Sequence, residues 1–120
     1  MKKILVIDDE FDFLELMKYR FEPKYYVVTA LSADDGIKKY HEQAPDLVIC
    51  DILMPLKDGI DVIKEIREKN TKTPIIVVSA IDSFDKINEA YREDANFYIT
   101  KPIDFSTLSL NIKTLLRGIQ

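Results

Sequence analysis

Residues 4–10 read Ile-Leu-Val-Ile-Asp-Asp-Glu, so four apolar residues run directly into three acidic ones. An apolar run without polar alternation is typical of a strand that is buried on both faces, as in a parallel sheet. The abrupt change to Asp8, Asp9 and Glu10 marks the end of that strand. The segment therefore predicts an α/β fold with acidic side chains at the carboxyl end of its first strand.

Three further apolar runs and a weaker fourth repeat this strand pattern, at residues 25–28, 47–50, 75–78 and 96–100. Between and after them, apolar side chains recur every three or four positions, which is typical of amphipathic helices. These stripes fall in residues 13–21, 62–66, 84–91 and 105–116, and Ser32 is a suitable cap for one more helix through residues 37 and 40. The alternation predicts five β-then-α units, and hence a doubly wound five-stranded parallel sheet with helices on both faces.

The composition narrows the class of protein. The chain has 120 residues, is 47% hydrophobic and 32% charged, and has a net charge of -4. This length predicts one domain over residues 1–120 without a second catalytic domain. The acidic balance argues against non-specific binding to nucleic acid or to an anionic membrane surface. The single cysteine, Cys50, cannot form an internal disulfide. No apolar run is long enough for a signal sequence or a membrane span. We therefore expect a cytoplasmic protein.

Polar side chains follow the expected strands at the points where they end. Asp8 and Asp9 follow the first strand, Asp51 follows the third, Ser79 ends the fourth, and Lys101 follows the fifth. In open parallel sheets, ligands bind at the carboxyl ends of the strands. If the first and third strands are neighbours, their carboxylates converge, and two such charges about 4 Å apart repel by about 4 kcal/mol at an effective dielectric constant near 20.

A divalent cation would relieve this repulsion. A few hard oxygen ligands at an open site favour Mg²⁺ over zinc, because the chain offers no cluster of Cys and His residues. With Lys101 as a cation and Ser79 as a hydroxyl donor, the set indicates phosphoryl transfer to an aspartate. Asp51 is the candidate nucleophile.

The chain resembles a bacterial response-regulator receiver domain from end to end. The matching segments are Ile4-Leu5-Val6-Ile7-Asp8-Asp9-Glu10, Asp51-Ile52-Leu53-Met54-Pro55-Leu56-Lys57-Asp58-Gly59, Ser79-Ala80 and Tyr98-Ile99-Thr100-Lys101-Pro102. The resemblance implies a flavodoxin-like (βα)5 fold with strand order 2-1-3-4-5. It also implies a cis peptide bond between Lys101 and Pro102. The chain departs from the family pattern at Asp94, a position where a glycine is usual.

The resemblance implies roles for the site residues. Asp51 would take a phosphoryl group from the phosphohistidine of a sensor histidine kinase or a phosphotransfer protein. Asp9 and Asp51 would bind Mg²⁺ directly with the backbone carbonyl of Leu53, and Asp8 would act mainly through a metal-bound water. Lys101 would contact a phosphoryl oxygen. Such a domain is a regulatory phosphoacceptor and not an enzyme with a released product.

The resemblance also implies a switch. Ser79 would be the switch hydroxyl and Tyr98 the switch aromatic, and the fourth helix, fifth strand and fifth helix would form the output face for a homodimer or another partner. Independently of the resemblance, we expect Leu53 and Ile81 to flank the approach of an attacking water to Asp51. Neither side chain can orient that water by hydrogen bonding, which predicts a long-lived acyl phosphate.

Other functions remain open on the residues alone. A Mg²⁺-dependent phosphatase of the haloacid dehalogenase type would have an Asp general acid/base two residues after the nucleophile, where this chain has Leu53. A flavodoxin would have a phosphate-cradling first loop, and a pseudo-receiver would serve only as an interaction module. Asp8-Asp9 could instead cap the first helix, and Tyr98 could be a packing residue. Gly59 is interpreted as a flexible backbone position at a helix start.

Overall fold

The computed structural model describes residues 1–117, so residues 118–120 of the expected domain lie outside the described part. Five strands form one parallel sheet: β1 (Lys3–Ile7), β2 (Tyr26–Ala30), β3 (Leu47–Cys50), β4 (Ile75–Ser79) and β5 (Phe97–Thr100). The strand order is β2-β1-β3-β4-β5, as the resemblance implies. One helix follows each strand: α1 (Phe11–Phe21), α2 (Ala33–Gln43), α3 (Gly59–Lys69), α4 (Phe84–Arg92) and α5 (Phe105–Arg117).

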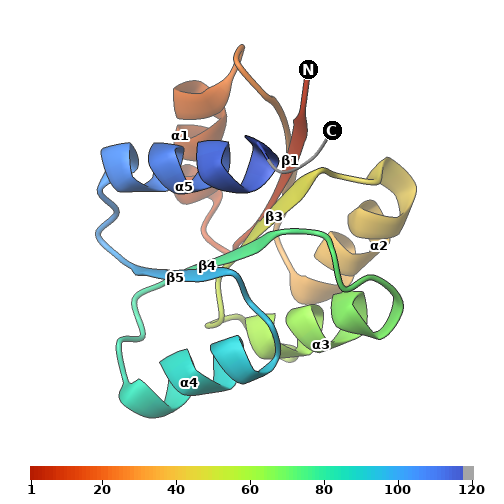
Figure 1. Ribbon diagram of the computed structural model, residues 1–120, viewed down its shortest axis with the longest axis vertical. Coiled ribbons are helices and arrows are strands. Elements are labelled where there is room, and N and C mark those ends of the chain that lie inside the picture. Colours follow the sequence, from red (N-terminus) through yellow and green to blue (C-terminus); the bar gives the residue numbers. More distant parts are fainter. Residues whose placement is uncertain (118–120) are drawn as a thin grey trace.

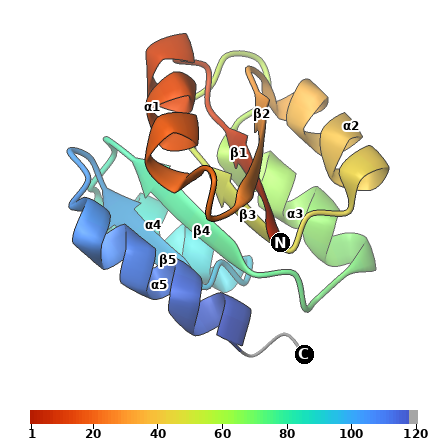
Figure 2. The ribbon, with the colours of Figure 1, turned by 90° about the horizontal axis from the view of Figure 1, so that it is seen from above.

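The helices form two layers, one on each face of the sheet (Figures 1 and 2). Alternate residues of β1 point to opposite faces: Ile4 and Val6 pack with the buried residues of α1 and α5, and Leu5 and Ile7 pack with those of α2, α3 and α4. The sheet is therefore covered on both sides, which explains why its central strands are apolar without alternation. The predicted doubly wound α/β fold is confirmed.

One predicted strand is displaced along the chain. The run 25–28 predicts a strand that starts at Tyr25, but β2 begins at Tyr26 and continues to Ala30. The Tyr25 N–H donates to the Phe21 carbonyl at 2.9 Å, and the two rings pack with their centroids 6.3 Å apart. Tyr25 therefore closes the turn after α1, and its aromatic character reflects contact with that helix. The weak fifth strand likewise begins one residue later than predicted, at Phe97.

Two local expectations, a cap at Ser32 and a cis bond before Pro102, are confirmed. The Ser32 hydroxyl accepts from the Asp35 N–H at 3.1 Å and so caps α2. The Lys101–Pro102 bond is cis, and Asp94 has a φ of 71°, the left-handed conformation for which glycine is usual. Among the described residues, no helix has both the length and the apolar composition needed to cross a membrane.

Candidate functional site

The site begins where β1 and β3 end side by side. These strands pair in parallel with Ile7 opposite Cys50, so the residues that follow them leave the sheet at the same level. The Asp51 N–H donates to the Ile7 carbonyl at 3.0 Å, which carries the pairing one residue beyond β3. Asp8 and Asp51 are therefore neighbours at this edge, as the sequence predicts.

Three carboxylates form an acidic cluster here. Asp8, Asp9 and Asp51 each offer one oxygen, and these oxygens lie within 4.8 Å of one another. The Asp8 and Asp51 side chains are 1% and 6% exposed, whereas Asp9 is exposed. Burial raises the pKa of the Asp8 carboxyl, and hydrogen bonds from the Glu10 N–H and from Lys101 partly oppose this shift. Because like charges this close repel, the cluster needs a neighbouring cation.

Lys101 supplies positive charge to the cluster. Its N–H donates to the Ser79 carbonyl at 2.9 Å, which fixes the backbone just after β5. Its ammonium donates to Asp8 at 2.9 Å, to Glu10 at 3.3 Å and to Asp51 at 3.4 Å. Burial would lower the pKa of this ammonium, but the hydrogen bond to Asp8 and the charge of Asp51 outweigh burial and raise it. Lys101 therefore stays protonated at neutral pH.

Glu10 is a member of this constellation to which the sequence assigned no role. It directly follows the acidic pair, so its position was visible, but its pairing with Lys101 depends on how the chain turns into α1. The helix-capping alternative for Asp8-Asp9 is wrong, because the N-cap of α1 is Glu10 and makes no side-chain cap bond. The Asp8 carboxylate accepts instead from the Glu10 N–H at 2.9 Å.

The loop after β3 orients the Asp51 side chain. Asp51 Oδ1 accepts from the Leu53 N–H at 3.1 Å, which leaves Oδ2 facing Lys101. The Leu53 side chain is 62% exposed beside this carboxylate. The use of the Leu53 carbonyl as a metal ligand stays a prediction.

The start of α3 lies directly against the Asp51 backbone. The Gly59 N–H donates to the Ile52 carbonyl at 3.0 Å. A Cβ at Gly59 would lie 2.8 Å from the Asp51 carbonyl carbon and from the Ile52 Cα, and closer still to the Asp51 carbonyl oxygen. Gly59 does not have a positive φ, so the interpretation as a flexible backbone position is corrected. Glycine is needed here because two backbone segments approach closely.

Ser79 and Tyr98 meet at the backbone of Ile81. The fully buried Ser79 hydroxyl accepts from the Ile81 N–H at 3.2 Å, and the Tyr98 hydroxyl donates to the Ile81 carbonyl at 2.5 Å. Burial raises the pKa of the Tyr98 phenol, and a hydrogen bond with Ser79 opposes this shift. The predicted switch residues are therefore in contact through one loop, and Tyr98 has a specific polar partner besides its packing against the core.

The donor set of the acidic cluster fits a hard divalent cation. It consists of carboxylate oxygens only. Two of them come from the buried side chains of Asp8 and Asp51, and the third comes from Asp9, which is exposed to solvent. Mg²⁺ is usually held by one or two carboxylates together with waters and phosphate oxygens. The residues present therefore suit Mg²⁺, with Asp8, Asp9 and Asp51 as the residues that would hold it.

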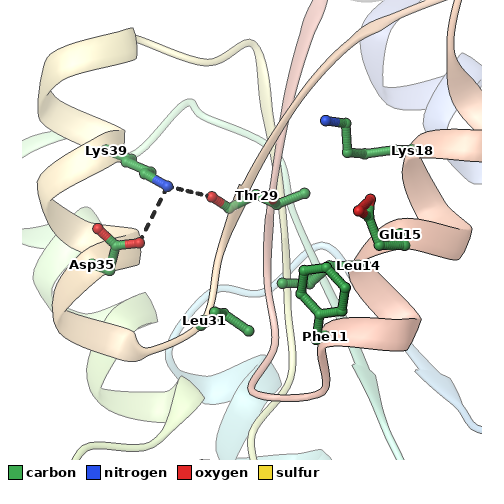
Figure 3. Close-up of a pocket in the computed structure, with 8 residues that line it drawn as sticks. All are labelled: Phe11, Leu14, Glu15, Lys18, Thr29, Leu31, Asp35 and Lys39. Atoms are coloured by element: carbon green, nitrogen blue, oxygen red, sulfur yellow. Dashed lines mark hydrogen bonds and ion pairs between the residues drawn. The ribbon is translucent and has the colours of Figure 1, made fainter.

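Two surface hollows flank α1. The first, about 150 Å³, lies between α1, β2 and α2 (Figure 3). The Lys39 ammonium lies beside it, where it donates to the Thr29 carbonyl at 2.6 Å and pairs with Asp35 at 3.2 Å. None of the predicted site residues lines this hollow, so it is separate from the acidic cluster.

The second hollow adjoins the acidic cluster, and we name it the Lys101 groove. Its volume is about 270 Å³, and it is lined by Phe13, Leu16, Lys101, Pro102, Ile103 and Phe105. Leu16, one of the apolar residues of this lining, is 44% exposed. The groove therefore places an open apolar surface next to the ammonium that contacts Asp51.

Comparison with known proteins gives consistent matches over the whole chain. Residues 4–113 match the family described as response regulator receiver domain. The chain is 36% identical over 118 residues to the alkaline phosphatase synthesis transcriptional regulatory protein PhoP of Bacillus subtilis. This alignment covers 97% of this chain and 49% of that protein. The chain thus spans about half the length of the curated relatives that it matches first.

Solved structures show the same likeness. A response regulator receiver domain protein from Clostridium thermocellum is 31% identical, with a TM-score of 0.92 and coverage of 98% of this chain and 96% of that one. The receiver domain of the Francisella response regulator 1452 is 27% identical, also with a TM-score of 0.92, and the match covers 100% of both chains.

Proposed function

Because this chain belongs to the response regulator receiver domain family of two-component systems, we propose that Asp51 accepts a phosphoryl group from the phosphohistidine of a sensor histidine kinase or a phosphotransfer protein. The observation that carries this proposal is the convergence of Asp8, Asp9 and Asp51 with the Lys101 ammonium at one edge of the sheet.

Asp51 acts as the nucleophile. One of its carboxylate oxygens forms a bond to phosphorus in line with the donor, while the bond from phosphorus to the imidazole nitrogen breaks and its electron pair stays on the histidine. The Leu53 N–H holds Oδ1, so the carboxylate presents a fixed face to the donor. Lys101 remains protonated and donates to the equatorial phosphoryl oxygens as their charge develops.

Asp9, Asp51 and the Leu53 carbonyl would hold Mg²⁺, with Asp8 acting through a water, and the ion would supply positive charge against the phosphoryl oxygens. The burial of Asp8 suits this role, because a buried carboxylate is stabilised by a cation far more than an exposed one is. The Lys101 ammonium pairs directly with Asp8 and Asp51.

The phosphoryl group remains on the chain, so the domain is a regulatory phosphoacceptor rather than an enzyme with a released product. Leu53 occupies the place where an aspartate-nucleophile phosphatase of the dehalogenase type has its general acid/base. A leucine side chain cannot transfer a proton, which argues against that alternative.

Phosphorylation is proposed to switch the surface around Tyr98. The Ser79 hydroxyl leaves the Ile81 N–H to donate to the phosphoryl group, and the phenol of Tyr98 follows into the space that it leaves. One charge-assisted hydrogen bond contributes about 1.5–3 kcal/mol, which shifts a two-state equilibrium roughly ten- to a hundredfold. Phe84 and Tyr91 on α4 are 77% and 43% exposed, which suits α4, β5 and α5 as the output face for a homodimer or another partner.

The donor protein is proposed to dock at the Lys101 groove. It must bring its phosphohistidine to Asp51, and the groove shares Lys101 with the acidic cluster. Exposed apolar side chains such as Leu16 there suit an amphipathic helix of the partner.

Intact-mass measurement after incubation with acetyl phosphate and Mg²⁺ tests the proposal. Wild-type protein should gain the mass of one phosphoryl group, and Asp51→Asn should gain none. An equal gain in Asp51→Asn, or none in folded wild-type protein, would contradict it. Turnover of a small phosphomonoester with release of phosphate would favour the phosphatase alternative.

A further inference from the structure

The Lys101 ammonium has a neighbour besides its three carboxylates, the aromatic ring of Phe13 on α1. The nitrogen lies 4.4 Å from the centroid of this ring, well inside the distance of about 6 Å at which a cation–π interaction is effective. The Lys101 side chain is 17% exposed and Phe13 is partly buried against the core. The ring therefore takes the place of water on one side of the ammonium, which strengthens the attraction.

The carboxylates alone do not fix the ammonium in one place. Lysine carries its charge on a flexible stem of four methylenes, and its three acceptors belong to three different residues. Glu10, which accepts from the ammonium together with Asp8 and Asp51, is 67% exposed, so its hydrogen bond is open to water. The Phe13 ring attracts the cation without accepting one of its conventional hydrogen bonds, so it restrains the ammonium and leaves its N–H donors for oxygen atoms.

The same ring also forms part of the Lys101 groove. Phe13 and Lys101 line this groove together with Leu16, Ile103 and Phe105. An apolar side chain inserted there would cover the exposed part of the ring and exclude water from the ammonium. Occupation of the groove and the position of Lys101 are therefore physically linked through one residue.

We propose that Phe13 is a positioning residue for Lys101, whose ring holds the ammonium at Asp51 and links occupation of the Lys101 groove to phosphoryl transfer. This inference rests on the proposed function of Asp51. It assigns to an aromatic side chain a role in the reaction that an aliphatic residue of similar size would not fulfil.

Two substitutions at Phe13 and one matched control test the proposal. Phe13→Leu removes the ring and keeps an apolar side chain, and Phe13→Tyr keeps the ring. Phe11→Leu removes another ring of α1, one that is 60% exposed and lines the hollow that is separate from the acidic cluster. For each variant, NMR gives the chemical shift of the Lys101 methylene protons next to the ammonium, assigned with Lys101→Arg, and intact mass gives the rate of phosphorylation by acetyl phosphate with Mg²⁺.

In Phe13→Leu, we expect the Lys101 protons to lose their upfield ring-current shift and the phosphorylation rate to fall roughly fivefold, the equivalent of one partly desolvated cation–π contact. Phe13→Tyr and Phe11→Leu should retain both properties. The proposal is overturned if Phe13→Leu changes neither property, if Phe13→Tyr is as slow as Phe13→Leu, or if Phe11→Leu slows the reaction as much. If wild-type protein gains no phosphoryl mass, the proposed function fails, while the Lys101 shift still supports or overturns positioning by Phe13.

Discussion

Replacing Gly59 by alanine places a methyl group against the backbone that carries Asp51. The added Cβ would lie 2.8 Å from the Asp51 carbonyl carbon and from the Ile52 Cα, whereas ordinary contacts begin at 3.4 Å. The neighbours are backbone atoms that cannot rotate away, so α3 and the segment after β3 must separate by at least about half an ångström. Overpacking of this kind costs roughly 1–3 kcal/mol, which lowers the melting temperature by about 4–12 °C in a domain of this size.

The same displacement should slow phosphorylation. A misplacement of about 1 Å can reduce a rate a hundredfold, so a shift of about half that size predicts a loss of roughly tenfold. Calorimetry measures the melting temperature, and intact mass over time with acetyl phosphate and Mg²⁺ measures the rate at a temperature where each variant is folded.

Gly36→Ala in α2 is a matched control. The three atoms nearest to a Cβ there would all belong to the Ile7 side chain, at 2.5–2.9 Å, whereas those at Gly59 belong to the backbone of Asp51 and Ile52. It should lower the melting temperature by a similar amount and leave the phosphorylation rate within about twofold of wild type, because a side chain can adjust its rotamer. The reasoning is refuted if folded Gly59→Ala reacts as fast as wild type, or if Gly36→Ala is slowed to the same extent.

Three further predictions concern the ion, the acyl phosphate and a turn. Mg²⁺ at a hundred times its Kd should stabilise the fold by about 2.7 kcal/mol, which calorimetry would detect as a rise of about 10 °C in the melting temperature. Asp9→Asn should lose most of this rise. An undiminished rise in Asp9→Asn would exclude Asp9 as a ligand. Leu53→Asn introduces an amide that can orient an attacking water, so the phosphorylated protein should lose its phosphoryl group roughly five- to tenfold faster, as measured by intact mass over time. An unchanged rate would argue against Leu53 as a protecting residue. Asp94→Gly should raise the free energy of unfolding, measured in urea, by about 0.5–1 kcal/mol, because glycine adopts the observed φ of 71° without strain. The substitution also keeps the backbone carbonyl of residue 94, which accepts from Arg67. A loss of stability would show that the Asp94 side chain itself contributes to the fold.

The sequence predicts the central part of the site because residues that directly follow the strands of a parallel sheet lie together at one edge of that sheet. Asp8 and Asp51 each follow a buried apolar run directly, and parallel pairing brings the ends of such runs to one edge. Lys101 follows the last strand and reaches the same edge. The chemistry of the cluster could therefore be inferred before its geometry was known.

Features that depend on side-chain packing could not be predicted in this way. Helical spacing places Phe13 on the apolar stripe of α1, but spacing does not show that its ring contacts Lys101. Gly59 offers no side chain from which a close backbone approach can be inferred. Tyr25 has the composition of a strand residue, yet it packs on Phe21 at the end of α1, so β2 starts after it.

Chemical mapping of the phosphorylated residue tests the role of Asp51 most directly. Borohydride reduces an acyl phosphate on aspartate to homoserine, and peptide mass spectrometry locates that residue in the chain. After treatment with acetyl phosphate and Mg²⁺, homoserine should appear at position 51 of the wild-type protein. Homoserine at another aspartate, or a borohydride-resistant phosphate on Ser79, would contradict the account.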